Sequence, residues 1–159
     1  MIVLGIDPGT ATMGYGLIEK KKGDISCLEY GVIKTPKDLS DHERLLIIDQ
    51  RLEEIFEEFN PVVMAIEKVY FKKNVKTAMT VTQAKGVAML KAAKREIPLH
   101  EFTPSQIKSA ITGHGKADKA QVQMMIKAEL NLKEKPRPDD AADALGAALC
   151  GLQKEKLIS

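Results

Sequence analysis

Hydrophobic residues at the start of the chain follow a pattern typical of β-strands joined by tight turns. The first six residues are mostly apolar and predict a buried strand, which Pro8 and Gly9 end in a turn. A second strand pattern follows over residues 11–19, and a third over residues 25–35. The sequence therefore opens with a meander of three strands.

The next apolar pattern has helical spacing. Ser40 followed by Glu43 is a capping-box pattern, and it predicts a helix that runs to about residue 59. The apolar stripe expected to face the core consists of Leu45, Ile48, Leu52, Ile55 and Phe59. A continuous apolar run over residues 62–66 then predicts a central strand that is covered on both faces.

Helices dominate the second half of the predicted structure. A stretch rich in Ala, Met and Lys over residues 75–95 favours a helix, and residues 97–102 favour a last strand. Further helix starts are indicated at Thr103, Asp118 and Asp139. Three strands followed by alternating helices and strands indicate an α/β fold with a mixed sheet, as one domain over residues 1–159.

Composition narrows the class of protein. The chain has 159 residues, of which 44% are hydrophobic and 29% charged, as is ordinary for a globular protein. No apolar run approaches the ~20 residues that span a bilayer, and the first residues lack a basic leader pattern, so a cytoplasmic location is expected. Cys27 and Cys150 have no metal-type spacing and are expected to be reduced core residues.

Charge is distributed unevenly along the chain. Residues 37–60 contain three basic and eight acidic residues, whereas residues 68–119 contain eleven basic and three acidic ones. This asymmetry favours a basic face for a polyanion beside a solvated acidic helix. The alternative to a polyanion-binding face is that these lysines simply lie on solvent-exposed faces of helices and bind nothing.

Four acidic residues occupy positions that favour metal binding. Asp7 and Glu67 each end an apolar strand, while Asp140 and Asp143 share one face of an alanine-rich helix. Carboxylates in such surroundings are partly desolvated and repel one another unless a cation compensates them, and oxygen ligands select Mg²⁺ or Mn²⁺ over zinc. Each residue has a simpler alternative role as a turn or helix cap, and Asp139 also shares a face with Asp143. The metal hypothesis depends on the four acids together.

Six motifs in order along the chain resemble the RuvC family of bacterial Holliday junction resolvases. They are Ile-Asp7-Pro-Gly-Thr, Ile-Glu67-Lys-Val-Tyr-Phe, Gln83-Ala-Lys-Gly-Val-Ala, Thr103-Pro-Ser-Gln-Ile-Lys108, Gly115-Lys-Ala-Asp-Lys119-Ala-Gln-Val and Asp140-Ala-Ala-Asp143-Ala-Leu. The resemblance implies a ribonuclease-H-like mixed sheet flanked by helices. It also implies a homodimeric, Mg²⁺-dependent endonuclease that nicks four-way DNA junctions symmetrically in recombination and repair, with the RuvA and RuvB helicase complex as partner.

The resemblance also assigns residues. It places the catalytic, metal-binding acids on Asp7, Glu67, Asp140 and Asp143, which suit a site for two Mg²⁺ ions with Mn²⁺ as a substitute. It places DNA contacts on Lys108 and Lys119, with Lys116 in the same basic loop, and an aromatic junction contact on Tyr70 or Phe71. The role of His114 beside that loop stays open.

The dimer surface is predicted on the helix over residues 75–95. Gly86, Met79 and Met89 lie on an apolar surface that is wide enough for both the core and a partner, although the helix could simply pack on its own sheet.

The same residues allow three alternative functions. Asp7-Pro-Gly-Thr also resembles the phosphate loop of actin-like ATPases and sugar kinases, but 159 residues leave no room for their second domain. A ribonuclease-H-like nuclease with another substrate, such as the YqgF family or RNase H itself, is the nearer alternative. A non-catalytic junction-binding protein is disfavoured by the complete set of acids.

Overall fold

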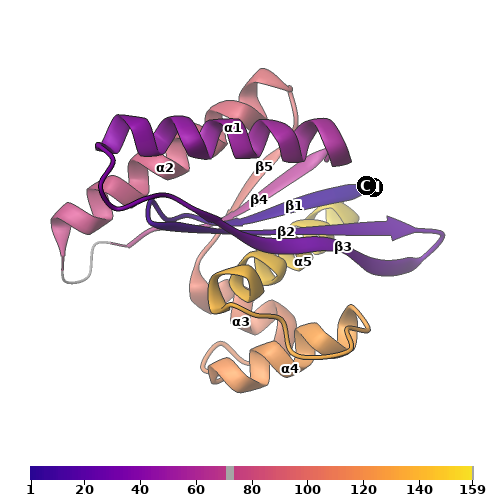
Figure 1. Ribbon diagram of the computed structural model, residues 1–159. Coiled ribbons are helices and arrows are strands. Elements are labelled where there is room, and N and C mark those ends of the chain that lie inside the picture. Colours follow the sequence, from indigo (N-terminus) through magenta and orange to yellow (C-terminus); the bar gives the residue numbers. More distant parts are fainter. Residues whose placement is uncertain (71–73, 159) are drawn as a thin grey trace.

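The computed structural model describes residues 1–70 and 74–158, which form a five-stranded mixed sheet flanked by helices (Figure 1). The strands are β1 (Ile2–Asp7), β2 (Thr12–Lys21), β3 (Asp24–Lys34), β4 (Val63–Glu67) and β5 (Leu99–Phe102). The helices are α1 (Asp41–Phe59), α2 (Val75–Lys94), α3 (Pro104–Thr112), α4 (Lys119–Glu129) and α5 (Asp139–Ile158). None of the helices in the described residues is long and apolar enough to cross a membrane.

The sheet has the order β3-β2-β1-β4-β5. Strands β1, β2 and β3 are antiparallel, whereas β4 runs parallel to β1 and β5 runs parallel to β4. This confirms the predicted mixed sheet. It also shows that the strands that carry Asp7 and Glu67 are neighbours. The strands predicted over residues 62–66 and 97–102 begin one and two residues later than expected.

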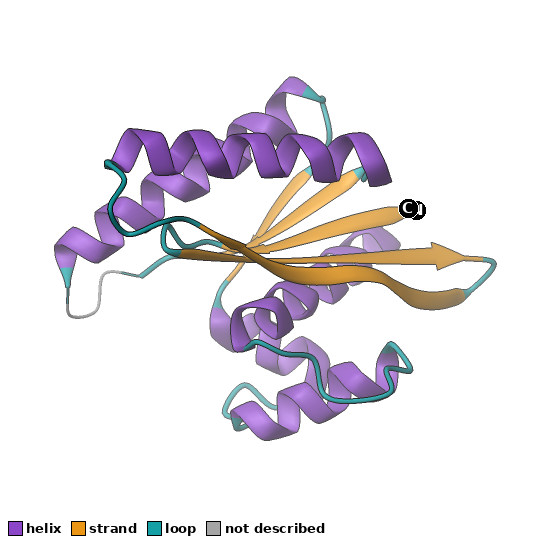
Figure 2. Cartoon of the chain, viewed as in Figure 1, coloured by secondary structure: helices purple, strands orange, loops and turns teal. Residues whose placement is uncertain are grey.

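The helices form layers on both sides of the sheet. Helices α1 and α2 cover one face and α5 covers the other, while α3 and α4 pack outside α5 (Figures 1 and 2). The predicted helix starts at Thr103 and Asp118 are confirmed, because each side chain accepts the amide of the Gln three residues later.

Side chains along the central strands alternate between these two layers. On β1, Leu4 and Ile6 face α1 and α2, and on β4 the same layer receives Met64 and Ile66. The alternate positions, which include Val3 and Val63, face α5. Asp7 and Glu67 continue that second set by the period of two residues, so both acids leave the sheet on the α5 side. They are also neighbours, because the parallel register pairs Ile6 with Ile66 one step earlier.

Helix α5 lies in unusually close contact with the sheet. A Cβ on Gly5 would come within 1.9 Å of the Ala144 carbonyl oxygen, and a Cβ on Gly14 would come equally near that of Asp140. The backbone of the helix therefore rests on the backbone of the strands, which only glycine allows. Almost every residue from Ala141 to Leu152 is buried between the sheet and the outer helices.

We expect Gly14→Ala to destabilise the protein by about 1–3 kcal/mol, because the added methyl forces the first turn of α5 away from β2. Chemical denaturation measures the loss. Ser109→Ala in α3 is the control, since Ser109 is exposed and alanine is the better helix former, so this change should gain about 0.5 kcal/mol. Equal stability of the Gly14→Ala variant and the wild type would contradict the close packing of α5.

Candidate active site

Three carboxylates gather where the end of β1 meets the start of α5. Asp7, Asp140 and Asp143 each place one oxygen within 4.8 Å of the others, and all three side chains are half-buried. Glu67 joins them through a hydrogen bond that it shares with Asp7. The four acids predicted from separate parts of the sequence thus converge on one site, on the α5 side of the sheet.

Burial and mutual repulsion make these carboxyl groups hard to ionise. Burial, followed by the charge of Glu67, raises the pKa of Asp7 to about 10. The same two causes raise the pKa of Asp143 to about 6, and burial also raises the pKa of Glu67. The hydrogen bond between Asp7 and Glu67 requires a proton, since two ionised carboxylates have none to donate. Without a cation the pair of Asp7 and Glu67 therefore retains a proton near neutral pH.

The donor set fits a hard divalent cation. The ligand atoms that converge here are carboxylate oxygens, which match the preference of Mg²⁺ and Mn²⁺. A bound cation would replace the retained proton and offset the repulsion between the acids. The site thus has the chemistry expected of a divalent metal centre.

Asp139 lies outside the cluster, although it directly precedes Asp140. Its Oδ2 lies 2.7 Å from Nζ of Lys119, and its Oδ1 accepts a hydrogen bond of 3.0 Å from the Gln123 side chain. These contacts hold the pKa of Asp139 below its usual value and raise the pKa of Lys119. The structure therefore groups Asp143 with Asp140 and not with Asp139.

A cavity of about 240 Å³ adjoins the acids. Its lining includes Glu67 and Asp143 together with the predicted DNA-binding lysines, Lys108 of α3 and Lys119 of α4. Its apolar lining includes Ile107, Val122 and Ile126. The cavity thus places cationic and anionic groups around one space that a phosphodiester could enter, with the lysines available for phosphate oxygens.

Gln123 was missed by the sequence reasoning. It lines the same cavity and bonds Asp139. Its position four residues after Lys119 on a helix was the available signal, because residues at that spacing share a face.

The remaining predicted contacts lie around this centre. Lys116 is exposed in the loop before α4, and its amide donates a 2.9 Å hydrogen bond to Nδ1 of His114. Both residues line a separate groove beside α4 rather than the cavity with the acids. Tyr70 is 51% exposed three residues after Glu67, while Phe71 lies outside the described residues.

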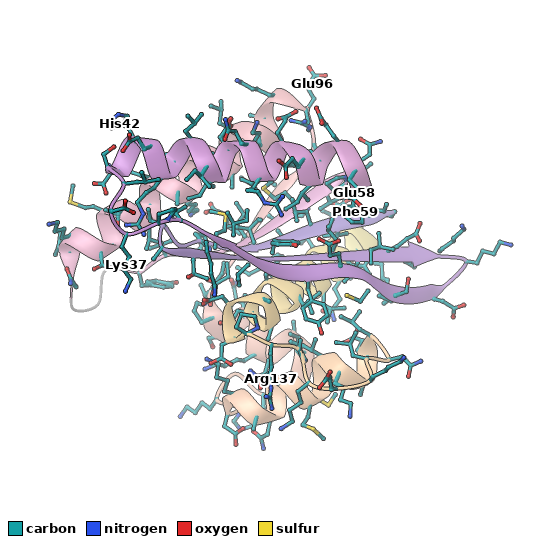
Figure 3. The ribbon with its side chains drawn as sticks, viewed as in Figure 1. Lys37, His42, Glu58, Phe59, Glu96 and Arg137 are labelled. Carbon is teal, nitrogen blue, oxygen red and sulfur yellow. The ribbon has the colours of Figure 1, made fainter. Side chains whose placement is uncertain are left out.

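The other two histidines lie away from the acids. His100 pairs with Glu155, and His42 contacts Ser40 at the start of α1. Figure 3 places His42 on the opposite side of the sheet from α3 and α4.

The predicted dimer surface is the outer face of α2. Ala84, Ala88 and Ala92 of this helix are buried. Met79 is 56% exposed and Met89 37% exposed, and the Cβ position of Gly86 is open. The helix thus leaves an apolar face uncovered in the single chain, and the prediction of a partner there remains a prediction.

Known proteins resemble this chain along nearly its whole length. A family model described as "Crossover junction endodeoxyribonuclease RuvC" matches residues 3–151. Proteins of that description from Halothermothrix orenii and Heliobacterium modesticaldum are 48% and 49% identical over 150 residues, which cover 94% of this chain and 91% and 93% of theirs. The solved structure "T. thermophilus RuvC in complex with Holliday junction substrate" superposes with a TM-score of 0.89 at 30% identity, covering 99% of this chain and 96% of that one.

In EDTA, we expect Asp7→Asn to be more stable than the wild type. An acid whose pKa is raised by folding costs stability once the pH exceeds its unfolded value near 3.8, and the cost grows until the folded pKa is reached. The amide removes this cost, so the melting temperature should rise by roughly 2–8 °C at pH 8 and by less at pH 5.

Asp139→Asn is the matched control for that measurement. Its carboxylate is exposed and paired with Lys119, so its replacement should change the melting temperature by at most about 2 °C. A lower melting temperature of Asp7→Asn in EDTA at pH 8 would show that Asp7 is not the strained, desolvated acid described above.

Proposed function

The chain belongs to the RuvC family, and we propose that it is a crossover junction endodeoxyribonuclease that resolves four-way DNA junctions by symmetric nicking during recombination and repair. The observation that carries the proposal is the convergence of Asp7, Asp140 and Asp143 beside a cavity lined by Lys108 and Lys119. Support also comes from the T. thermophilus relative, whose solved structure holds a Holliday junction substrate.

The acids would hold the metal cofactor. We propose that Asp7, Glu67, Asp140 and Asp143 bind two Mg²⁺ ions, with Mn²⁺ as a substitute. Such ions supply an activated water and neutralise charge on the reacting phosphate when bound. The chain's own part is to hold four carboxylates rigidly on strand ends and a buried helix, so that little reorganisation is needed when the ligands bind.

The lysines would hold the DNA strand in place. Lys108 and Lys119 line the same cavity as Glu67 and Asp143, where their ammonium groups would bind phosphate oxygens near the cleaved bond. Lys119 would exchange its surface ion pair with Asp139 for a phosphate, at small cost because both side chains are more than half exposed. Lys116 would add a more distant backbone contact, and Tyr70 or Phe71 would contact the junction itself.

Resolution of a four-way junction needs two nicks related by a two-fold axis. One active site per chain then requires two chains, and a two-fold interface uses the same surface on each. We propose that the exposed face of α2, with Met79, Gly86 and Met89, forms this interface. By family membership we also propose that the dimer works with the RuvA and RuvB helicase complex.

The function is tested by cleavage of a synthetic four-way junction. Asp7→Asn and Asp140→Asn should lose at least about 100-fold in nicking rate with Mg²⁺ present, because each loses an anionic ligand of the metal site. Junction binding should persist or strengthen, since negative charge near the DNA is removed. Asp139→Asn, the neighbouring control, should retain most of the activity.

Substrate comparison separates the alternatives. Nicking of a four-way junction in preference to linear duplex DNA and to an RNA–DNA hybrid is expected. Preference for the hybrid would favour an RNase H activity, and binding of the junction without nicking would favour a non-catalytic protein. Loss of nicking in Asp139→Asn but not in Asp140→Asn would overturn the assignment of the helix acids.

The proposed interface is tested by Gly86→Leu. A bulky side chain at the open Cβ position should push the partner helix away, giving a folded monomer by sedimentation and circular dichroism that no longer makes paired nicks. Ala128→Leu, which adds the same apolar bulk to an exposed position of α4, is the control and should stay dimeric. A Gly86→Leu protein that remains dimeric and resolves junctions would place the interface elsewhere.

A further inference from the structure

The turn after Asp7 is held by buried polar side chains. Within residues 1–70 and 74–158, the buried polar or charged side chains are Thr10, Thr35 and Lys91. Lys91 is bound by Asp49 and Glu53 of α1. The two threonines belong to a different network, and that network includes the turn between β1 and β2.

This network ties the turn to three separate elements. The Thr10 hydroxyl donates a 2.7 Å hydrogen bond to the Thr80 carbonyl of α2. The Thr35 hydroxyl, at the end of β3, donates a 2.6 Å bond to the Thr10 carbonyl. Arg44 of α1 in turn donates through Nε to the Thr35 hydroxyl at 2.7 Å. Thr10 is thus held through both its side chain and its backbone.

The turn itself is tight and stands directly behind the carboxylates. Asp7 is the last residue of β1, and the next strand begins at Thr12. A Cβ on Gly9 would lie 2.0 Å from the Thr12 carbonyl oxygen, so the chain reverses with no spare room. A displacement of Thr10 is therefore passed along a short, constrained segment to the backbone of Asp7.

The acids in front of the turn repel one another when they are ionised. One oxygen of Asp7 lies within 4.8 Å of an oxygen of Asp140 and of Asp143, and like charges at that distance tend to separate. A turn that was free to shift would let the Asp7 carboxylate move away from the other two. The bonds of Thr10 to Thr80 and Thr35 fix the turn between α2 and the end of β3, and so limit that shift.

We propose that Thr10 is a positioning residue for the metal site: its bonds to Thr80 and Thr35 hold the turn so that the Asp7 carboxylate stays beside Asp140 and Asp143. The proposal rests on the function proposed above, since it assumes that the cluster binds a divalent cation. Ligand-orienting partners of this kind commonly tune metal affinity without contacting the metal.

Removal of the hydroxyl should leave the fold intact. Valine has the shape of threonine, and the Thr80 carbonyl of an α-helix keeps its own amide partner when the threonine hydroxyl is lost. The Thr10 carbonyl also still accepts the Thr35 hydroxyl in such a variant. A Thr10→Val protein therefore loses one tether of the turn without leaving a buried group unpaired.

The test is a titration of the EDTA-treated protein with MnCl₂ and with MgCl₂, in the absence of DNA. The melting temperature is measured at each ion concentration, and its rise gives the ion affinity. Thr10→Val should bind these ions about 10–100-fold more weakly than the wild type. Thr10→Ser, which keeps the hydroxyl, should bind within about threefold of the wild type. Thr82→Val is the matched control, because Thr82 makes a similar 2.8 Å bond to a carbonyl of α2, that of Ala78, away from the turn.

Junction cleavage gives a second measurement. If Thr10 acts through metal affinity, the activity that Thr10→Val loses at low Mn²⁺ should return toward the wild-type rate at high Mn²⁺.

Wild-type affinity in a folded Thr10→Val protein would overturn the proposal. Should Thr10→Val fail to fold, Thr35→Val decides by the same criterion, since it removes the second tether. If neither ion changes the melting temperature of the wild-type protein, the assignment of the metal site is wrong, and the proposed function fails with it.

Discussion

The contact between the backbone of α5 and the backbones of β1 and β2 determines the geometry of this site. Gly14 is the cross-strand partner of Asp7, and it is also the residue whose missing side chain makes room for the Asp140 carbonyl. One glycine thus adjoins both parts of the carboxylate cluster. With any larger residue there, the helix would have to move outward and Asp140 would move with it. The close packing of α5 on the sheet thus also fixes the geometry of the carboxylate cluster.

That constraint has an electrostatic cost. The tight contact that brings the acids together also removes water from around them, and their pKa values rise because burial is the largest cause for Asp7 and Asp143 alike. Such a cluster destabilises the metal-free fold, so the surrounding structure must be rigid enough to hold it. An alanine-rich helix that is buried almost all round provides this rigidity, because it has few side-chain rotamers to adjust.

Much of this arrangement was predictable from local patterns. Period-two alternation along β1 and β4 puts Asp7 and Glu67 on one face, and the capping signals at Thr103 and Asp118 place the helices that carry Lys108 and Lys119. Local patterns could not choose between Asp139 and Asp140, since both lie in the first turn of α5, where acids are favoured, and Asp139 also shares a helix face with Asp143. The bonds of Asp139, Gln123 and Thr10 join residues far apart in the chain, so no spacing rule reveals them.

The sheet separates two kinds of surface, and the end of β1 is where they meet. The acids, the lysines and their cavity lie on the α5 side, while α2, with the face proposed for the partner chain, lies on the other. The turn after Asp7 lies beyond the end of β1, where the sheet does not separate the two sides. Thr10 of this turn can therefore bond to α2. If α2 carries the dimer contact, this hydrogen bond joins that helix to the turn behind the carboxylates, and any coupling between dimer formation and metal binding would act equally in both directions.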